Sequence, residues 1–290
     1  MQGNELTPYS NGQQPSPYFL LFESPAAPWK SIAKVLRANF LQATLMINQF
    51  GIYIQENTEN GGTMFEASMQ GQLFKMWHIP TFENPESVIC LGFDTKDFCE
   101  QLESVTKTNN LKIYVLASDV KTLQMDILGK DGTSHKFISL VNTKPGNLIA
   151  SDYKEHMPTA RVPGLRFSKV GTAAEKQSKL KVRITAQDKG IVVSSTSSTV
   201  RGFREDLGDW VDGKQILFDD VFSTARFKSF GWMGKTDVSR FIRIYAVPGG
   251  LPLRLSANVG DLGTCSLYLN PEAVPVAQVQ PPNAFAQLTY

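Results

Sequence analysis

The chain has 290 residues, of which 42% are hydrophobic and 19% charged, with a formal net charge of +2 at pH 7. This composition excludes an intrinsically disordered chain, and the length allows two domains with cores of their own. No run approaches the ~18 apolar residues of a membrane span, and the N-terminus lacks a signal-peptide pattern, so we expect an intracellular protein. The three cysteines show no C-x-x-C spacing, which favours reduced thiols.

The first part of the chain predicts an α+β unit. Residues 1–17 are rich in Gln, Asn, Pro and Ser and predict a disordered N-terminal arm, followed by a strand at 19–23. Residues 29–55, around which the chain is organised, begin with helical periodicity that separates a basic face from an apolar face. They end in β-branched and aromatic residues around Gly51, which suits a hairpin turn. A helix that runs into a hairpin lies across its own sheet.

The rest of the first half continues with strands and one more helix. We expect strands at 63–69, 73–78 and 87–93, a helix at 95–109 capped by Asp94 or Thr95, a hairpin of 111–116 with 122–128, and a strand at 136–140. Residues 141–158 interrupt this pattern with two prolines, a glycine and an adjacent apolar pair. They predict a connector between two halves, which can also serve as a docking surface.

The second half repeats the element order of the first. We expect a weakly helical stretch that begins at Arg166, followed by a strand, a turn with Gly190 and a strand at 191–195. Further strands follow at 200–207 and 216–218, then a helix at 219–230 begun by an acidic pair that suits the helix dipole, and closing strands at 241–247, 252–257 and 264–269. The pair Gly51-Ile52 matches Gly190-Ile191, and residues 111–115 resemble 242–246. These echoes indicate an internal duplication, the alternative being chance similarity of short strands.

The predicted organisation therefore has five parts. They are a disordered arm (1–17), a first domain (18–140), a connector (141–158), a second domain (159–271) and a proline-rich disordered tail (272–290). Motifs of catalysis do not occur in the sequence: His78, His135 and His156 have no metal-ligand spacing, and no phosphate-binding loop or nucleophile elbow is present. We therefore expect no enzyme, no cofactor and no metal site.

Basic residues recur on all four predicted helices, and two interpretations remain open. They are either ordinary solvated charges or, if the helices cover one side of a continuous sheet, a single positive surface that holds a phosphate backbone without reading bases. The candidate DNA-binding residues are Lys30, Lys34, Arg37, Lys96, Lys107, Arg166, Lys169, Lys176, Arg226, Lys228 and Lys235.

Three segments resemble the sliding clamps of the proliferating cell nuclear antigen (PCNA) family. Residues 29–55 are similar to the family's first helix and hairpin, and residues 92–115 (GFDTKDFCEQLESVTKTNNLKIYV) to its second helix and following strand. Residues 250–271 (GLPLRLSANVGDLGTCSLYLNP) are similar to its closing strands. Together the resemblance covers residues 19–271 and implies an α+β DNA clamp fold of two similar domains, each with helices on one face of antiparallel sheets.

The resemblance also implies a function without catalysis. Three chains would close head to tail into a ring around double-stranded DNA and tether a DNA polymerase and other replication and repair enzymes, with a clamp loader as a further partner. The strand near 134–140 of one chain would pair with 200–207 of the next. Partner peptides would dock under the connector at Leu148 or Ile149, Pro252, Tyr268 and Pro271, with Asn57 and Asn270 as departures from the family pattern.

The near-neutral charge and the two tails suggest a divergent clamp from a large DNA virus, acting in the host nucleus or a cytoplasmic viral factory. Two alternatives remain. One is a clamp-fold processivity factor that binds DNA directly as a monomer or dimer. The other is a non-replicative scaffold that keeps only the peptide pocket.

Overall fold

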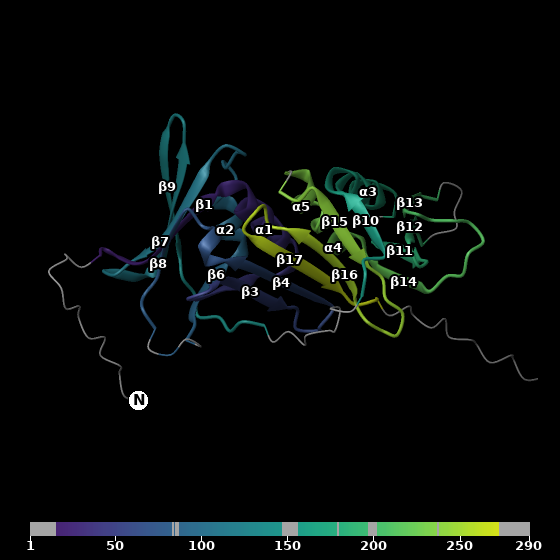
Figure 1. Cartoon of the computed structure of the whole chain (residues 1–290), viewed down its shortest axis with the longest axis horizontal. Helices are drawn as coiled ribbons and strands as arrows, with labels where there is room; N and C mark the ends of the chain where they lie inside the picture. The colour runs from purple at the N-terminus through teal and green to yellow at the C-terminus, as the bar shows by residue number, and fades with distance from the viewer. Residues whose placement is uncertain are drawn as a thin grey trace, which may run out of the picture.

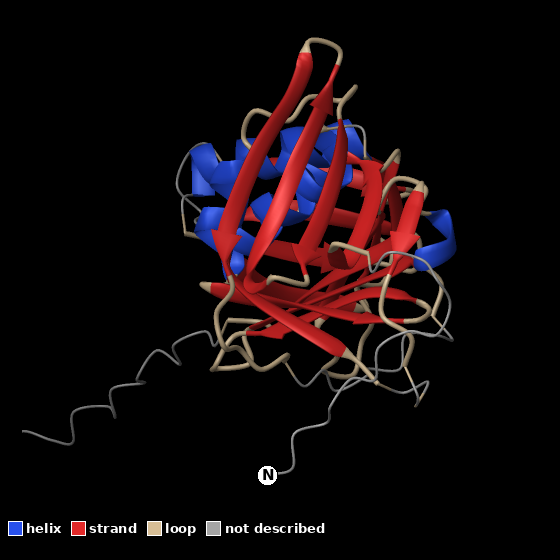
Figure 2. Ribbon diagram, turned by 90° about the vertical axis from the view of Figure 1, so that its left-hand side faces the viewer, coloured by secondary structure: helices blue, strands red, loops and turns tan. Residues whose placement is uncertain are grey.

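A computed structural model of the chain describes residues 16–82, 84, 87–146, 156–178, 180–196, 202–236 and 238–272. Its strands form three antiparallel sheets of five, eight and four strands. The helices pack on one another: α1 (Ala26–Asn39) contacts α2 (Thr95–Gln101), α4 (Thr224–Ser229) and α5 (Trp232–Lys235), and α3 (Gly164–Ser178) contacts α4 and α5. They gather into one layer, which Figure 2 shows behind the strands of the five-stranded sheet. Among the residues that the structure describes, no helix is long and apolar enough to cross a membrane.

The elements follow the order that the sequence predicts, except that two helices differ in extent, as described below, and that only 76–78 of the strand predicted at 73–78 is a strand. The sequence does not predict the strand Ala160–Pro163 or the one-turn helix Trp232–Lys235. The first half contains β1 (Tyr18–Pro25), α1 (Ala26–Asn39), β2 (Gln42–Asn48), β3 (Gly51–Asn57), β4 (Thr63–Gln70), the 3-10 turn η1 (Gly71–Leu73), β5 (Met76–His78), β6 (Ile89–Asp94), α2 (Thr95–Gln101), β7 (Asn110–Leu116), β8 (Asp119–Gly129) and β9 (Gly132–Ser139). The second half contains β10 (Ala160–Pro163), α3 (Gly164–Ser178), β11 (Lys181–Ala186), β12 (Gly190–Ser195), β13 (Arg204–Gly208), β14 (Phe218–Ser223), α4 (Thr224–Ser229), α5 (Trp232–Lys235), β15 (Phe241–Tyr245), β16 (Leu253–Asn258) and β17 (Gly263–Leu269).

The eight-stranded sheet joins the two halves of the chain. Its order is β10-β15-β16-β17-β4-β3-β2-β6, so that β17 from the end of the chain pairs with β4 from its beginning. The five-stranded sheet, β5-β1-β7-β8-β9, lies at one end of the long axis, and the four-stranded sheet, β13-β12-β11-β14, lies at the other (Figure 1). Strands β9 and β13 therefore form sheet edges at opposite ends of the molecule.

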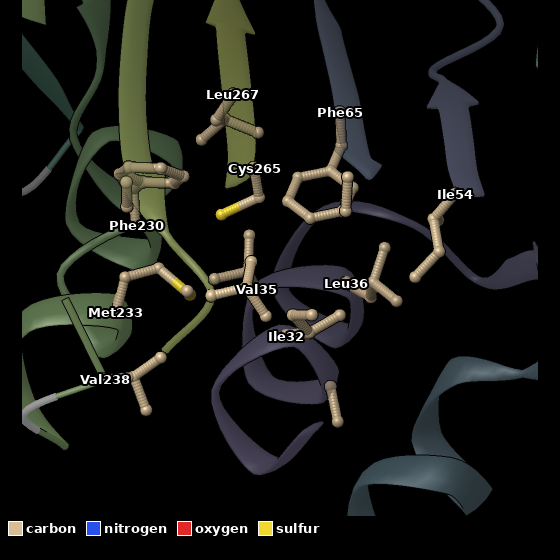
Figure 3. Packing of buried hydrophobic residues seen from close by; sticks show 14 of the residues in the cluster. Ile32, Val35, Leu36, Ile54, Phe65, Phe230, Met233, Val238, Cys265 and Leu267 are labelled. Carbon is tan, nitrogen blue, oxygen red and sulfur yellow. The ribbon is translucent and has the colours of Figure 1, made fainter. Parts of the chain in front are cut away.

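Helix α1 fills the centre of the core. Its residues Ile32, Val35 and Leu36 are fully buried and point toward the eight-stranded sheet, where Phe65 and Leu267 come from different halves of the chain (Figure 3). Burial of such side chains stabilises the fold by ~1.5–3 kcal/mol each. The apolar face predicted from the helical periodicity is therefore the element that fastens the two halves together.

The predicted helix at 95–109 is wrong in its second half. Helix α2 ends at Gln101, although the predicted cap is confirmed because the Asp94 side chain accepts hydrogen bonds from the backbone N–H groups of Lys96 and Asp97. Polar side chains after α2 bind the backbone instead of continuing the helix: the Asn109 Oδ1 accepts from the Thr106 N–H at 2.7 Å. Leu102 and Val105 remain buried, so the apolar spacing that suggested a longer helix reflects packing of turns.

The predicted helix at 219–230 is also wrong at its start. Phe218 to Ser223 form strand β14, which pairs with β11, and helix α4 begins only at Thr224. Phe218 and Phe222 are both buried, with ring centroids 6.1 Å apart, as expected of residues on one face of a strand. The acidic residues Asp219 and Asp220 therefore lie in an edge strand, and Asp219 is paired with Arg183 at 3.7 Å, rather than at a helix N-terminus.

Candidate nucleic-acid interface

Ten of the eleven predicted basic residues lie on the helices, all except Lys107, but their surroundings differ. Arg37 lies 3.8 Å from Glu100 and 3.9 Å from Glu103, and Lys228 is paired with Glu175. These carboxylates come from neighbouring helices or the turn after α2 and neutralise part of the local positive charge. An ion-paired cation is a weaker ligand for a phosphate because the existing pair must first be exchanged.

Two further basic side chains donate hydrogen bonds to backbone carbonyl groups of the protein, and a third lies against a turn. Lys30 Nζ donates to the carbonyl oxygens of Glu103 and Val105, both at 2.7 Å, and its pKa is lowered by burial and by the nearby charge of Lys34. Arg166 donates to the carbonyl of Asp206 at 2.7 Å. Arg226 lies against the β3–β4 turn, where a Cβ added to Gly62 would come within 2.7 Å of its Nη1.

A second group of basic residues has no neighbouring carboxylate to neutralise its charge. In the described residues, Lys34, Lys96, Lys169, Lys176 and Lys235 have no carboxylate within 4.0 Å. Lys34 and Lys235 lie over the ring of Trp232, a residue that sequence reasoning missed because its helix, α5, is only one turn long. Lys107 is exposed in the turn that follows α2, not on the helix. Of the eleven basic residues that the sequence nominates, these five lysines therefore have no carboxylate within 4.0 Å in the described residues.

The other face of the eight-stranded sheet carries the candidate peptide pocket. Strand pairing aligns Tyr245, Arg254, Tyr268 and Met64 in one row across four strands, because Tyr245 pairs with Arg254, Arg254 with Tyr268, and Tyr268 with Met64. Leu253 and Leu255 are buried in the main core, so the side chains that alternate with them point to the other face of the sheet. The row of Tyr245, Arg254, Tyr268 and Met64 therefore lies on the side of the sheet opposite to the helices.

Apolar side chains around Tyr268 form a small cluster of their own. Tyr268 and Val247 are buried and pack against Met64, Tyr245 and Leu251. The Tyr268 hydroxyl donates to Glu66, and burial raises the pKa of this tyrosine well above its ordinary value. Of the predicted pocket residues, Pro252 is half-buried just before β16 and Pro271 is exposed just after β17, while Leu148 and Ile149 lie outside the described residues.

The first residues of the predicted connector cross the same outer face. The Val141 N–H donates to the Gly92 carbonyl, the Thr143 and Thr44 hydroxyls lie 2.7 Å apart, and the Gly146 N–H donates to Gln55. Gly146 fits closely, since a Cβ there would come within 2.6 Å of the Asn57 side-chain oxygen. Asn57 therefore lies at the root of the connector, next to the buried carboxyl of Glu56.

Replacing Glu56 with Gln is expected to remove a pH dependence of stability. Glu56 Oε1 accepts a hydrogen bond from the Thr44 N–H at 2.7 Å, and burial raises the pKa of this carboxyl from 4.5 to about 7. The native state therefore holds a proton that the unfolded state has released between those pH values, so stability falls as pH rises through this window.

At pH 8, E56Q should be more stable than the wild type by ~1–3 kcal/mol, and at pH 4 the two should be nearly equal. Urea unfolding at both pH values measures the difference, with T44S, which keeps the backbone donor, as the control. An equal effect of E56Q at pH 4 and pH 8 would show that Glu56 does not titrate in this way.

Neither a protein-family model nor a curated protein sequence matches the chain. Its structure, however, is similar to solved structures of proliferating cell nuclear antigens. It superposes on PCNA from Entamoeba histolytica with a TM-score of 0.70 at 13% sequence identity, over 88% of this chain and 100% of that one. The match to a chain of the PCNA2-PCNA3 complex from Sulfolobus tokodaii has a TM-score of 0.71 at 15% identity, again over 88% and 100%. The chain therefore has the α+β DNA clamp fold that the sequence predicts.

Proposed function

We propose that the chain is a DNA sliding clamp, in which three copies close into a ring around double-stranded DNA and tether a polymerase and other replication and repair enzymes. The observation that carries this proposal is the single layer of basic helices that spans both halves of a clamp fold. Such a layer supplies positive charge over a length that no single helix offers, and it contacts the phosphate backbone without reading sequence. The protein would act by enclosure and not by catalysis.

Edge strands at the two ends of the molecule support the ring. Strand β9 ends the five-stranded sheet and β13 ends the four-stranded sheet, so one copy's β9 can pair with the β13 of the next. This contact joins two different surfaces and is therefore heterologous, which yields a closed ring when the rotation between copies closes. Phe137, 71% exposed on β9, would be covered by the neighbouring copy.

The outer apolar cluster supports docking of partner peptides. Met64, Tyr245 and Leu251 offer half-buried apolar surface packed on the buried Tyr268 and Val247. Pro252 and Pro271 lie nearby in the sequence. We propose that Leu148 and Ile149 of the connector complete this pocket and that clamp-binding peptides of replication proteins occupy it. The proposed domain limits, 18–140 and 159–271, place one half of the chain on each side of this connector.

The source of the chain belongs to the same proposal. A net charge of only +2 and the extra segments at both ends support a clamp encoded by a large DNA virus. It would then act in the host nucleus or in a cytoplasmic viral factory.

Light scattering over a dilution series tests the ring. We expect a species of about 96 kDa, three times the 32.1 kDa of the chain, that persists on dilution. A stable monomer or dimer would contradict the ring and favour a clamp-fold factor that holds DNA directly by its basic helices. A ring without any affinity for DNA would instead favour a scaffold that keeps only the peptide pocket.

A further inference from the structure

Two lysines from different halves of the chain meet on one aromatic ring in the helix layer. Lys34 of α1 lies over the indole of Trp232 with its Nζ 4.0 Å from the ring centroid, and Lys235 of α5 lies 4.5 Å from it. The indole is half-buried and packs against the main core, so its position is fixed. The Ser31 and Thr236 hydroxyls, 2.5 Å apart, fasten α1 to α5 at the same junction.

Both ammonium groups lie within 4.5 Å of the same ring centroid. Neither has a carboxylate within 4.0 Å in the described part of the chain, whereas Arg37 and Lys228 on the same layer do. Lys30 lies close enough for the Lys34 charge to lower its pKa. Like charges on flexible side chains would separate in water, and attraction to the negative face of the indole offsets part of this repulsion.

We propose that Trp232 is a positioning residue that holds the Lys34 and Lys235 ammonium groups together as one binding site for a phosphate of DNA. That the ligand is DNA rests on the proposed function. The arrangement of the three side chains is independent of that function. Each ammonium has three donors and no acceptor, so a pair of them suits the oxygens of a phosphodiester. Holding both near their bound positions lowers the entropy cost of binding.

The geometry favours contact with the backbone over stacking with a base. The two ammoniums lie over the indole ring, where a base would have to displace them. A base in a duplex is already stacked and paired, while the phosphates are accessible. Trp232 therefore acts through the lysines, and its replacement should weaken binding although it removes no charge.

The test measures binding of a short linear DNA duplex by fluorescence anisotropy over a series of salt concentrations. W232L should weaken binding about threefold to tenfold at low salt, because leucine has no π face to attract the two ammonium groups. The plot of log affinity against log salt concentration should become less steep, by up to ~0.9 for each phosphate that the lysines no longer neutralise. W232F, which keeps a weaker π face, should lie between the wild type and W232L.

A double-mutant cycle separates positioning from other roles. In a K34Q/K235Q background, W232L should cause no further decrease in affinity, because the lysines that it positions are gone. W77L is the matched control, since Trp77 is also half-buried against the core but lies on β5. K112Q is the second control, since Lys112 lies 4.6 Å from the Tyr18 ring on the five-stranded sheet. Neither control should change DNA affinity.

Two results would overturn the inference. One is unchanged affinity and salt slope in W232L. The other is an equal decrease from W232L in the K34Q/K235Q background, which would mean that the indole contacts DNA itself. Failure of the proposed function looks different: the wild type would then not bind the duplex at low salt. In that case Trp emission still tests the arrangement, because K34Q/K235Q should shift it in the wild type but not in W232L.

Discussion

A Phe137→Pro variant is expected to remain folded and to lose the ring, so that light scattering finds the 32.1 kDa chain as a monomer. The Leu140 N–H donates to Lys121 of β8, and N–H groups alternate in direction along a strand. The Phe137 N–H therefore points away from β8, toward the edge that would pair with the next copy. Proline removes this donor without breaking the β8–β9 ladder, and it also removes an exposed apolar side chain.

The expected loss of association follows from two interactions that are removed at every interface of the ring. Removal of one backbone hydrogen bond and of one buried apolar side chain should each weaken association by about tenfold, and every interface of a ring carries the same change. F137S is the matched control, because it removes the side chain but keeps the N–H, and it should weaken the ring less. K136P should instead destabilise the fold, since the Lys136 N–H points toward β8. A persistent trimer of F137P would show that β9 does not form the interface.

The main features of this fold are readable from the sequence because they rest on local periodicity. Residues 29–55 show a 3.6-residue apolar stripe followed by strand-forming residues on both sides of a turn, and both become α1 and the β2–β3 hairpin. The sequence wrongly favours a helix over most of strand β14 because Asp219 and Asp220 form an acidic pair that suits a helix N-terminus. Pairing with β11, a tertiary contact, places them in a strand instead. Short helices such as α4 and α5 give too few turns to show a period.

The candidate interface was less predictable because charge compensation is a tertiary property. Nothing near Lys228 in the sequence indicates that Glu175 of another helix neutralises it, or that Lys30 caps carbonyls of the turn after α2. Trp232 gave a weak signal, a tryptophan three residues before a lysine, but its contact with Lys34 joins residues from opposite halves of the chain. The sequence identifies the basic positions, but only the packing of the helices shows which of them have a carboxylate or carbonyl partner.

This difference between the basic positions leads to the prediction with the largest effect on DNA binding. The double charge reversal K169E/K176E should weaken binding of duplex DNA at low salt by at least about 100-fold while the ring stays intact. Both lysines are exposed on α3, seven residues apart and so on one face, and neither has a carboxylate within 4.0 Å in the described residues. Their reversal would replace two attractive interactions by two repulsive ones on each copy.

The control must change net charge equally without touching the helix layer. K189E/K214E does so, since Lys189 lies in the β11–β12 turn and Lys214 in the loop between β13 and β14, both exposed. If the helix layer is the DNA face, this control should change affinity by no more than about twofold, because screened charges away from the contact act weakly. Equal decreases in the two variants would mean that DNA responds only to overall charge. A face of basic helices would then carry no specific role, and enclosure alone would have to hold the DNA.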